Sequence, residues 1–238
     1  MGALSPISAL ATEAPTWLCV PETAGSTVTA DGSKGECAAK TTSVELPPTA
    51  ELATLRGILP YINYVESGIG GKPTIQFDAA NVQIVSGTGS TGITNGRGNL
   101  VIGYDENGGK HEQTGSHNLI LGEEQTFTSY GDILGGGKNV GNSQSSIVGG
   151  RENTTNGPYA SAIGGTGNIA SGEGSTIDGG RENVTTVAWA STSGGYKNEV
   201  KSNYGWIGGG YKNKVNSIAA SIFGGKELIT EKEYEAIP

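Results

Sequence analysis

The chain has 238 residues, of which 41 are glycine, and only 34% belong to the apolar set of Ala, Val, Ile, Leu, Met, Phe, Trp, Tyr and Cys. Because glycine has no side chain to bury, a thick single-chain core is not expected, and no apolar run approaches the roughly 20 residues that would insert into a membrane. The net charge is −8 with Lys and Arg scattered along the chain, which argues against nucleic acid or an anionic membrane surface as a partner.

Residues 1–48 are expected to form an N-terminal arm and a small β module. Trp17–Val20 and Ser43–Leu46 have the character of short strands. The only two cysteines, Cys19 and Cys37, flank a Gly/Ser/Thr-rich stretch. An even number of cysteines close in sequence fits a disulfide, with two unpaired thiols as the alternative. Such a bond would stabilise the module by roughly 3 kcal/mol and favours an oxidising, extracellular location.

Residues 49–97 are expected to form a short helix and then strands that lead into the next region. Thr49 can cap a helix that Pro60 limits to about 50–59. A short heptad seam runs along this helix, made by Leu52, Leu55, Leu59 and Ile62. The seam either packs on its own chain or forms a short trimerising neck. Thr74–Phe77 and Val82–Val85 alternate with period two and are predicted to be strands.

A 15-residue repeat dominates residues 98–228. Gly-Gly pairs recur with a spacing of 14 once and then of 15 five times, beginning at Gly135, Gly149, Gly164, Gly179, Gly194, Gly209 and Gly224. An asparagine stands four residues after the first glycine of the first six pairs, at Asn139, Asn153, Asn168, Asn183, Asn198 and Asn213, and Leu228 takes this place after the seventh pair. A third column stands two residues before each pair, at Ile133, Ile147, Ala162, Ile177, Thr192, Ile207 and Ile222.

The repeat predicts one coil of a parallel β-solenoid, with two strands of about four or five residues and two tight turns. Gly-Gly and Asn adopt φ > 0 at little cost and are expected in the turns, with the asparagines forming a ladder of amide hydrogen bonds. The isoleucine column is expected to point inward and stack between coils about 4.8 Å apart. A single coil buries little, so stability must come from neighbouring coils and, with such small interior residues, from neighbouring chains. The charged residues 229–238 are expected to cap the C-terminal end.

The segment Ser161–Gly172, with the sequence Ser-Ala-Ile-Gly-Gly-Thr-Gly-Asn-Ile-Ala-Ser-Gly, resembles the head repeats of YadA-like trimeric autotransporter adhesins and related bacterial or phage surface fibres. The resemblance covers about residues 98–228. It implies an all-β, left-handed parallel β-roll that is homotrimeric and serves adhesion rather than catalysis. The 15-residue period and the Gly-Gly turn depart from the adhesin pattern, and without a long coiled-coil stalk or membrane anchor a self-secreting autotransporter is not expected.

Motifs for catalysis, metal binding or cofactor binding are weak. Gly87–Gly92 matches the dinucleotide fingerprint, but Thr94–Gly98 cannot form the helix that would hold a pyrophosphate. His111 and His117 have no partner at metal-ligand spacing, and Asn168 replaces the liganding Asp of calcium-binding β-roll repeats. No nucleophile, base and orienting acid occur together. We therefore expect no catalytic residue, no metal, no cofactor and no enzymatic activity.

Aromatic residues recur in two columns of the repeat. Tyr159, Trp189 and Tyr204 stand ten residues after their Gly-Gly starts, and Tyr196 and Tyr211 stand two residues after theirs. Rings on adjacent coils would lie about 5 Å apart, which suits stacking against the sugar rings of a glycan. Packing at turns or across a trimer interface is the alternative. The glycosylation sequons at Asn153 and Asn183 are expected to be incidental to the repeat.

The function expected from the sequence is that of a non-enzymatic structural or adhesive surface-fibre protein. Its partners would be two further copies of the chain in a homotrimer and a cell-surface glycan or protein receptor. Its location would be extracellular, at a cell surface or at the surface of a virion-like particle. Two alternatives remain, a receptor-binding tail fibre of a phage-like particle and a filament subunit that associates head to tail with its own kind.

Overall fold

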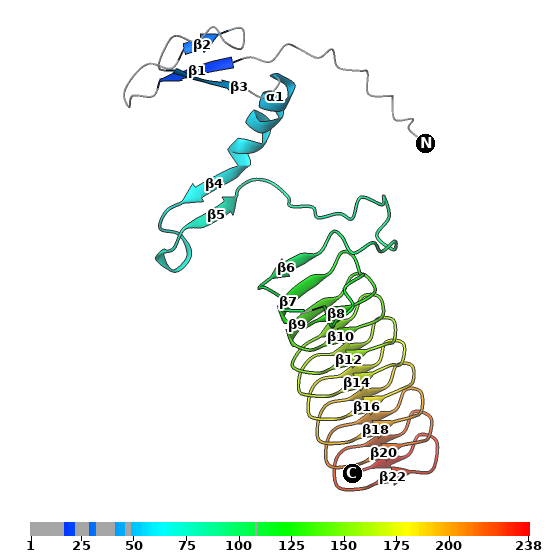
Figure 1. The fold of residues 1–238 in the computed structure, drawn as a ribbon. Helices are drawn as coiled ribbons and strands as arrows, with labels where there is room; N and C mark the ends of the chain where they lie inside the picture. Colours follow the sequence, from blue (N-terminus) through cyan, green and yellow to red (C-terminus); the bar gives the residue numbers. More distant parts are fainter. Residues whose placement is uncertain (1–16, 22–28, 32–40, 46–48, 108) are drawn as a thin grey trace. The chain divides into compact units, whose positions relative to one another are not determined.

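The computed structural model describes residues 17–21, 29–31, 41–45, 49–107 and 109–238, with side chains described from Ala53 onward. The chain divides into two compact units between Val82 and Gln83. The first unit holds a small antiparallel sheet, a helix and a hairpin, and the second is a parallel β-solenoid (Figure 1). The predicted all-β solenoid fold with one short helix near the N-terminus is thus confirmed.

Three antiparallel strands form the sheet of the first unit. Strand β1 (Trp17–Pro21) lies between β2 (Thr29–Asp31) and β3 (Thr41–Glu45). Both strands predicted on either side of the cysteine-containing loop are confirmed as β1 and β3. The three-residue β2 has too short a pattern to be recognised in the sequence.

The helix α1 (Thr49–Ile58) covers the predicted range, and the 3-10 turn η1 (Leu59–Tyr61) follows it. Pro60 lies in this turn, where its missing N–H and its ring prevent further α-helix. Leu55 and Leu59 are 50% and 62% exposed, so the described part of the chain leaves this portion of the apolar seam uncovered. Whether the seam packs on its own chain or forms a neck with other copies stays a prediction.

A hairpin of β4 (Ile62–Val65) and β5 (Thr74–Phe77) follows, and β5 confirms a predicted strand. The 3-10 turn η2 (Ile69–Gly71) lies in its loop. The prediction of a strand at Val82–Val85 is wrong, because this segment forms no ladder with any described strand and its Val82 stays 61% exposed. Alternating apolar residues predict a strand, but a β-strand also needs a neighbouring strand to pair with, and the alternation does not show whether one is present.

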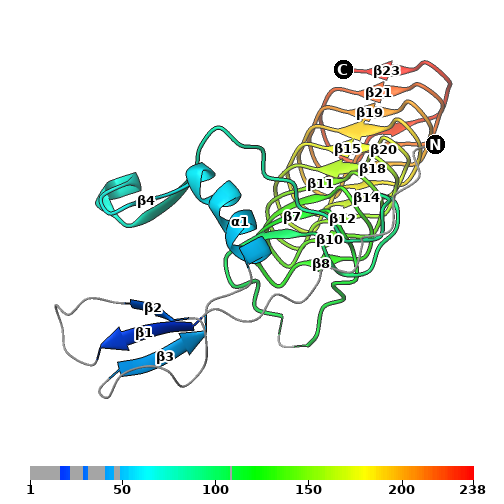
Figure 2. The same cartoon turned by 90° about the horizontal axis from the view of Figure 1, so that it is seen from above.

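Two parallel sheets build the solenoid, one on each side of the stacked coils (Figure 2). The ten-stranded sheet contains, in spatial order, β6 (Leu100–Ile102), β7 (Leu119–Glu123), β9 (Ile133–Gly137), β11 (Ile147–Val148), β13 (Ser161–Ala162), β15 (Thr176–Ile177), β17 (Ser191–Thr192), β19 (Trp206–Ile207), β21 (Ser221–Ile222) and β23 (Ala236–Ile237). The eight-stranded sheet contains β8 (Thr126–Phe127), β10 (Val140–Gly141), β12 (Thr154–Thr155), β14 (Ile169–Ala170), β16 (Val184–Thr185), β18 (Glu199–Val200), β20 (Lys214–Val215) and β22 (Ile229–Thr230). Most strands are shorter than predicted because left-handed residues interrupt the ladder at both turns.

The coil length changes along the solenoid. Ile133 pairs with Ile147 and Ile147 with Ser161, a step of 14, whereas Ser161 pairs with Thr176, a step of 15. The additional residue is Ile163, which separates the inward-facing Ala162 from its Gly-Gly pair and is 53% exposed.

This extra residue overturns part of the predicted inward column. In the shorter coils the inward residue directly precedes the Gly-Gly pair, so Leu134 and Val148 are buried while Ile133 and Ile147 are 42% and 46% exposed. The prediction that Ile133 and Ile147 point inward is therefore wrong. The predicted column points inward only from Ala162 onward.

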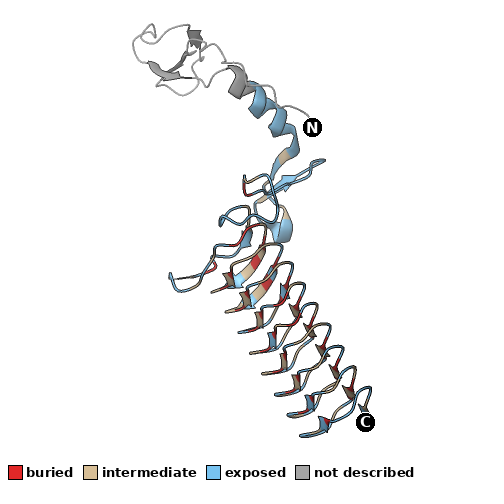
Figure 3. Ribbon diagram, turned by 90° about the vertical axis from the view of Figure 1, so that its right-hand side faces the viewer, coloured by how far each residue is buried: buried red, intermediate tan, exposed pale blue. Residues whose placement is uncertain are grey.

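Two columns of small and medium side chains fill the interior, and Figure 3 shows the buried residues recurring in every coil. The ten-stranded sheet contributes Ile120, Leu134, Val148, Ala162, Ile177, Thr192, Ile207 and Ile222. The eight-stranded sheet contributes Phe127, Gly141, Thr155, Ala170, Thr185, Val200, Val215 and Thr230. Each column stacks at the inter-strand spacing, so a substitution in one coil is felt by its two neighbours.

Three left-handed residues shape a full coil, illustrated by Gly180 (φ 81°), Glu182 (φ 54°) and Trp189 (φ 58°). We call the first of the two turns, from the Gly-Gly pair to the residue before the asparagine, the Gly-Gly turn. A Cβ on Gly180 would collide with the carbonyl oxygen of Gly195 in the next coil, so this close stacking requires glycine. The prediction that the asparagine adopts φ > 0 is wrong, because the residue before it does.

Residues 229–238 continue the solenoid, since β22 pairs with β20 and β23 pairs with β21. The Glu235 carboxylate closes their turn by accepting hydrogen bonds from the backbone N–H groups of Glu231 (2.7 Å) and Lys232 (3.1 Å). These two bonds, with that from Glu231 the larger, lower the pKa of Glu235.

Candidate functional surfaces

The asparagine column forms a ladder inside the Gly-Gly turns. All six residues, Asn139, Asn153, Asn168, Asn183, Asn198 and Asn213, are 0% exposed. The Nδ2 of Asn183 donates to the carbonyl oxygens of Gly179 (3.1 Å) and Gly195 (3.1 Å). Its Oδ1 accepts from the backbone N–H of Asn198 at 2.9 Å. Each amide therefore joins its own turn to the next coil, and the ladder runs from side chain to main chain.

Burial of these amides also bears on the two glycosylation sequons. Asn153 and Asn183 have no exposed surface, and each uses both its Nδ2 and its Oδ1 in hydrogen bonds within the solenoid. A glycan cannot be attached to either side chain in the folded solenoid.

Tyr196 and Tyr211 contact each other in the Gly-Gly turns, with ring centroids 5.7 Å apart and ring planes tilted by 45°. Cations cover both rings: the Arg181 guanidinium lies 5.7 Å from the Tyr196 centroid, and the Lys226 Nζ lies 5.7 Å from that of Tyr211. Lys197, 5.1 Å from the Tyr196 centroid, has its pKa raised chiefly by its hydrogen bond to Tyr196 and further by Glu182. These tyrosines are thus engaged in a cation–π column that links four coils.

The other predicted aromatics lie on the opposite turn of the coil. Tyr159, Trp189 and Tyr204 are 54%, 53% and 62% exposed, and each has φ near +60°. Sequence reasoning overlooked Tyr234, which stands 30 residues after Tyr204 in the same column and is 76% exposed. The five predicted aromatic residues therefore do not form one surface but belong to two, on opposite turns.

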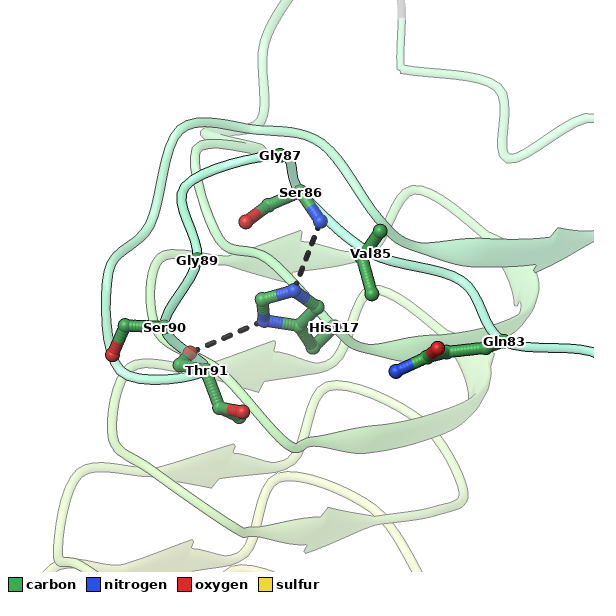
Figure 4. A pocket seen from close by; sticks show the side chains of 8 residues that line it. All are labelled: Gln83, Val85, Ser86, Gly87, Gly89, Ser90, Thr91 and His117. Carbon is green, nitrogen blue, oxygen red and sulfur yellow. Dashed lines mark hydrogen bonds between the residues drawn. The ribbon is translucent and has the colours of Figure 1, made fainter. Parts of the chain in front are cut away.

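His117 lies beside a cavity of about 410 Å³ that the Gly87–Gly92 loop helps to enclose (Figure 4). Its Nε2 accepts a hydrogen bond from the Ser86 N–H (3.0 Å), and its Nδ1 donates to the Thr91 carbonyl oxygen (3.1 Å). Both ring nitrogens thus anchor the loop, and neither is free for a metal or for proton transfer. No helix follows Gly92 through Gly98, as the sequence predicts.

His111 is also engaged in local contacts. Its Nδ1 lies 3.2 Å from the Thr126 Oγ1, and its Nε2 lies 3.3 Å from the Glu124 Oε2. Over the described ranges, no group of three or more His, Cys, Asp or Glu side chains is placed to hold a metal ion.

Asp132 is a buried carboxyl of the solenoid, 1% exposed, with its Oδ1 accepting from the Ser146 N–H at 2.8 Å. Its Oδ2 has no hydrogen-bond partner within the described residues. Desolvation by burial raises the pKa of Asp132 from 3.8 to about 7, against the opposing effect of the Ser146 hydrogen bonds. Because its Oδ1 bonds the backbone of the next coil, the residue has a structural part in the stack, as the asparagines do.

The predicted disulfide concerns a residue outside the described part of the chain. Cys19 lies in β1, where it pairs with Thr29 and Ser43. Cys37 lies outside the described residues, so the bond between these cysteines stays a prediction.

Within the described part of the chain, no helix is long and apolar enough to cross a membrane. Comparison of the sequence and structure with protein-family models, curated proteins and solved structures finds no match. The resemblance to trimeric adhesin heads therefore rests on the repeats themselves and on the solenoid that they form.

Proposed function

We propose that the protein is a non-enzymatic structural module of an extracellular surface fibre and that it assembles as a homotrimer. The observation that supports this most is the continuous asparagine ladder, which stacks coil on coil without interruption from Asn139 to Asn213. A ladder of this kind produces a regular, elongated element whose interior is filled by its own side chains. Such an element suits load-bearing and display better than catalysis.

Two apolar rows on the outer face of the ten-stranded sheet support assembly with other copies. Over the first coils these rows consist of Leu100, Ile102, Ile133, Ile147 and Ile163, all between 42% and 57% exposed. In the middle coils the same face carries Ser161, Thr176 and Ser191 instead, and the exposed Phe223 with its neighbour Trp206 restores apolar surface in the last coils. Exposed apolar side chains gathered at the two ends of this face, with polar residues between them, are typical of protein contacts.

The exposed apolar seam along α1 is a second surface that needs cover from other copies of the chain. A ten-residue helix is too short to be stable alone in water, and Leu55 and Leu59 have no cover from the described chain. Three such helices around a common axis would bury these leucines against one another.

Size-exclusion chromatography with light scattering tests the trimer directly. The expected mass is three times 24.2 kDa. The double variant Ile133→Ser, Ile147→Ser, which gives the early coils the serine found at Ser161, should lower the trimer fraction. A matched change on the other sheet, Val184→Thr, should leave it unaltered. A monodisperse monomer at micromolar concentration, or equal loss of trimer in both variants, would refute trimerisation through this face.

A further inference from the structure

The turn opposite the Gly-Gly turn carries large, more than half-exposed rings that its backbone conformation does not require. We call the left-handed residues of this turn the corner column; they are His117, Gly131, Ser145, Tyr159, Gly174, Trp189, Tyr204, Ala219 and Tyr234. Their φ values lie between 54° and 73° whichever residue is present. Glycine is the residue that adopts this conformation without strain, and bulky side chains rarely do.

The backbone hydrogen bonds of the corner are also the same whichever side chain is present. Trp189 donates its N–H to the Glu173 carbonyl oxygen at 2.8 Å, and Ala219 donates in the same way to the Asn203 carbonyl oxygen at 3.0 Å. Glycine and alanine thus build the same corner as tryptophan and tyrosine. The Trp189 ring covers Gly174 of the preceding coil, and the Tyr159 hydroxyl accepts a hydrogen bond from the Gln144 Nε2 at 3.2 Å. Tyr159, Trp189 and Tyr204 nevertheless remain more than half exposed although the backbone of the corner does not require their rings, which points to contact with something outside the chain.

The corner column also differs from the tyrosines of the Gly-Gly turns in charge. Lys and Arg are absent from the corner column and from the residues that directly precede its members, whereas Glu173 and Asn203 stand exposed at those preceding positions. The tyrosines of the opposite turn are covered by Arg and Lys. The corner therefore offers ring faces together with hydrogen-bonding groups and no cation, which does not suit an anionic ligand.

The exposed area of the three rings favours a sugar chain over a protein as the ligand. Three rings of roughly 150–250 Å² each, a little more than half exposed, present only about 350 Å². A stable protein contact buries about 800 Å² on each partner, so the rings by themselves are too small for one. A polysaccharide chain can contact successive rings one sugar at a time, since Trp189 and Tyr204 stand on adjacent coils at the inter-strand spacing of about 4.8 Å.

We propose that Tyr159, Trp189 and Tyr204 form a stacking face for a neutral polysaccharide that lies along the corner of the solenoid. Each ring would stack on one pyranose face, and Glu173 and Asn203 would bond hydroxyl groups beside it. The proposal deepens the proposed surface-fibre function by giving the fibre a class of ligand.

Affinity electrophoresis of the full chain tests it, with dextran, yeast mannan, barley β-glucan and xyloglucan in separate gels. Retardation is expected in at least one gel. In that gel the double variant Trp189→Gly, Tyr204→Gly should bind at least tenfold more weakly. This variant reproduces the Gly174 corner and should fold, which far-ultraviolet circular dichroism checks. The matched control on the opposite turn, Tyr196→Thr, reproduces the native Thr166 and should bind like the wild type.

Absence of retardation in all four gels, or equal binding by the wild type and the double variant, would overturn the proposal. So would equal weakening in Tyr196→Thr, or loss of the oligomer in the double variant, which would make the corner a contact between copies. The mass of each variant is measured by light scattering in parallel. A trimer that binds no polysaccharide contradicts the glycan face alone, and a wild-type monomer contradicts the trimer alone.

Discussion

At the scale of single residues, Asn183 shows what holds one coil to the next. Its amide bonds two glycine carbonyls and one backbone N–H, in a site with no exposure. The same bonds recur at each asparagine of the column, so the contribution of one residue is repeated along the solenoid. A buried donor or acceptor that loses its partner costs about 1–3 kcal/mol.

We predict that Asn183→Ala lowers the free energy of unfolding by about 2–4 kcal/mol, since the Asn198 N–H loses its acceptor and the Gly179 carbonyl loses its donor. Chemical denaturation followed by circular dichroism measures this. The control is Asn156→Ala, because Asn156 is exposed and its side chain bonds only exposed side chains: its Nδ2 donates to the Ser171 hydroxyl and its Oδ1 accepts from the Asn142 Nδ2. This change should stay within about 0.5 kcal/mol. Equal effects of the two substitutions would contradict the structural role of the ladder.

Asp132, in contrast to Asn183, lowers the folding stability near neutral pH. The folded protein holds its proton up to a pKa of about 7, whereas the unfolded chain releases it near 3.8. The contribution of Asp132 to folding stability is therefore greatest below pH 3.8, falls as the pH rises from 3.8 to about 7, and is constant above. A difference of one in pKa between the folded and unfolded chain is worth about 1.4 kcal/mol, so the ionised carboxylate lowers stability by up to about 4 kcal/mol at a pH of about 8.

The variant Asp132→Asn should thus be more stable than the wild type at about pH 8 and lose that advantage near pH 4. One coil earlier, Asn118 already occupies the equivalent site, with its Oδ1 accepting from the Asp132 N–H at 2.8 Å and its Nδ2 donating to the Ser129 carbonyl oxygen at 3.2 Å. Denaturation midpoints at the two pH values give the result. Asp178→Asn, at an exposed position, is the control. An advantage of Asp132→Asn that is the same at both pH values would disprove the linkage.

At the scale of elements, the coil is the unit that can be removed. Ser175 and Ala190 end successive coils, so deleting residues 176–190 joins two coils without changing which side chains face inward. Each coil contacts only its neighbours, so the loss should be that of one repeat. We predict a cooperative thermal transition with a slightly lower midpoint. Deleting residues 176–182 instead leaves a coil of incorrect length and should lower the midpoint far more; equal effects would contradict the modular account.

The regular part of this architecture can be predicted from the sequence, because three residue columns that recur with the same period indicate a repeated coil. The period does not say where in the coil an extra residue lies. Ile163 therefore could not be identified as an insertion, and Ile133 and Ile147 were assigned to the wrong face for that reason. Asparagine was assigned to a left-handed turn because its turn propensity and its use in a buried amide ladder produce the same sequence pattern.

The candidate surfaces were only half predictable. Spacing identified both aromatic columns, but it did not show that one has its rings covered by cations. That information was present in the sequence, since Arg181, Tyr196, Tyr211 and Lys226 follow one another at intervals of 15 residues. What the spacing cannot give is the exposure of Trp189, which depends on the direction in which a left-handed residue projects from the turn.

At the scale of the whole molecule, the chain combines a filled solenoid, apolar rows that other copies can cover, and a net charge of −8 that favours the solubility of such assemblies. A predicted disulfide between Cys19 and Cys37 would place the chain in an oxidising environment. From these features we propose that the protein is found in fibres outside the cell or on the surface of a particle.

Immunogold electron microscopy of the native source, with antibodies raised against the solenoid, tests that central claim most directly. Gold is expected along thin projections from the cell or particle surface, and disruption of the coding sequence should remove both the label and the projections. Label confined to the cell interior, or projections that persist unchanged without the protein, would contradict the account.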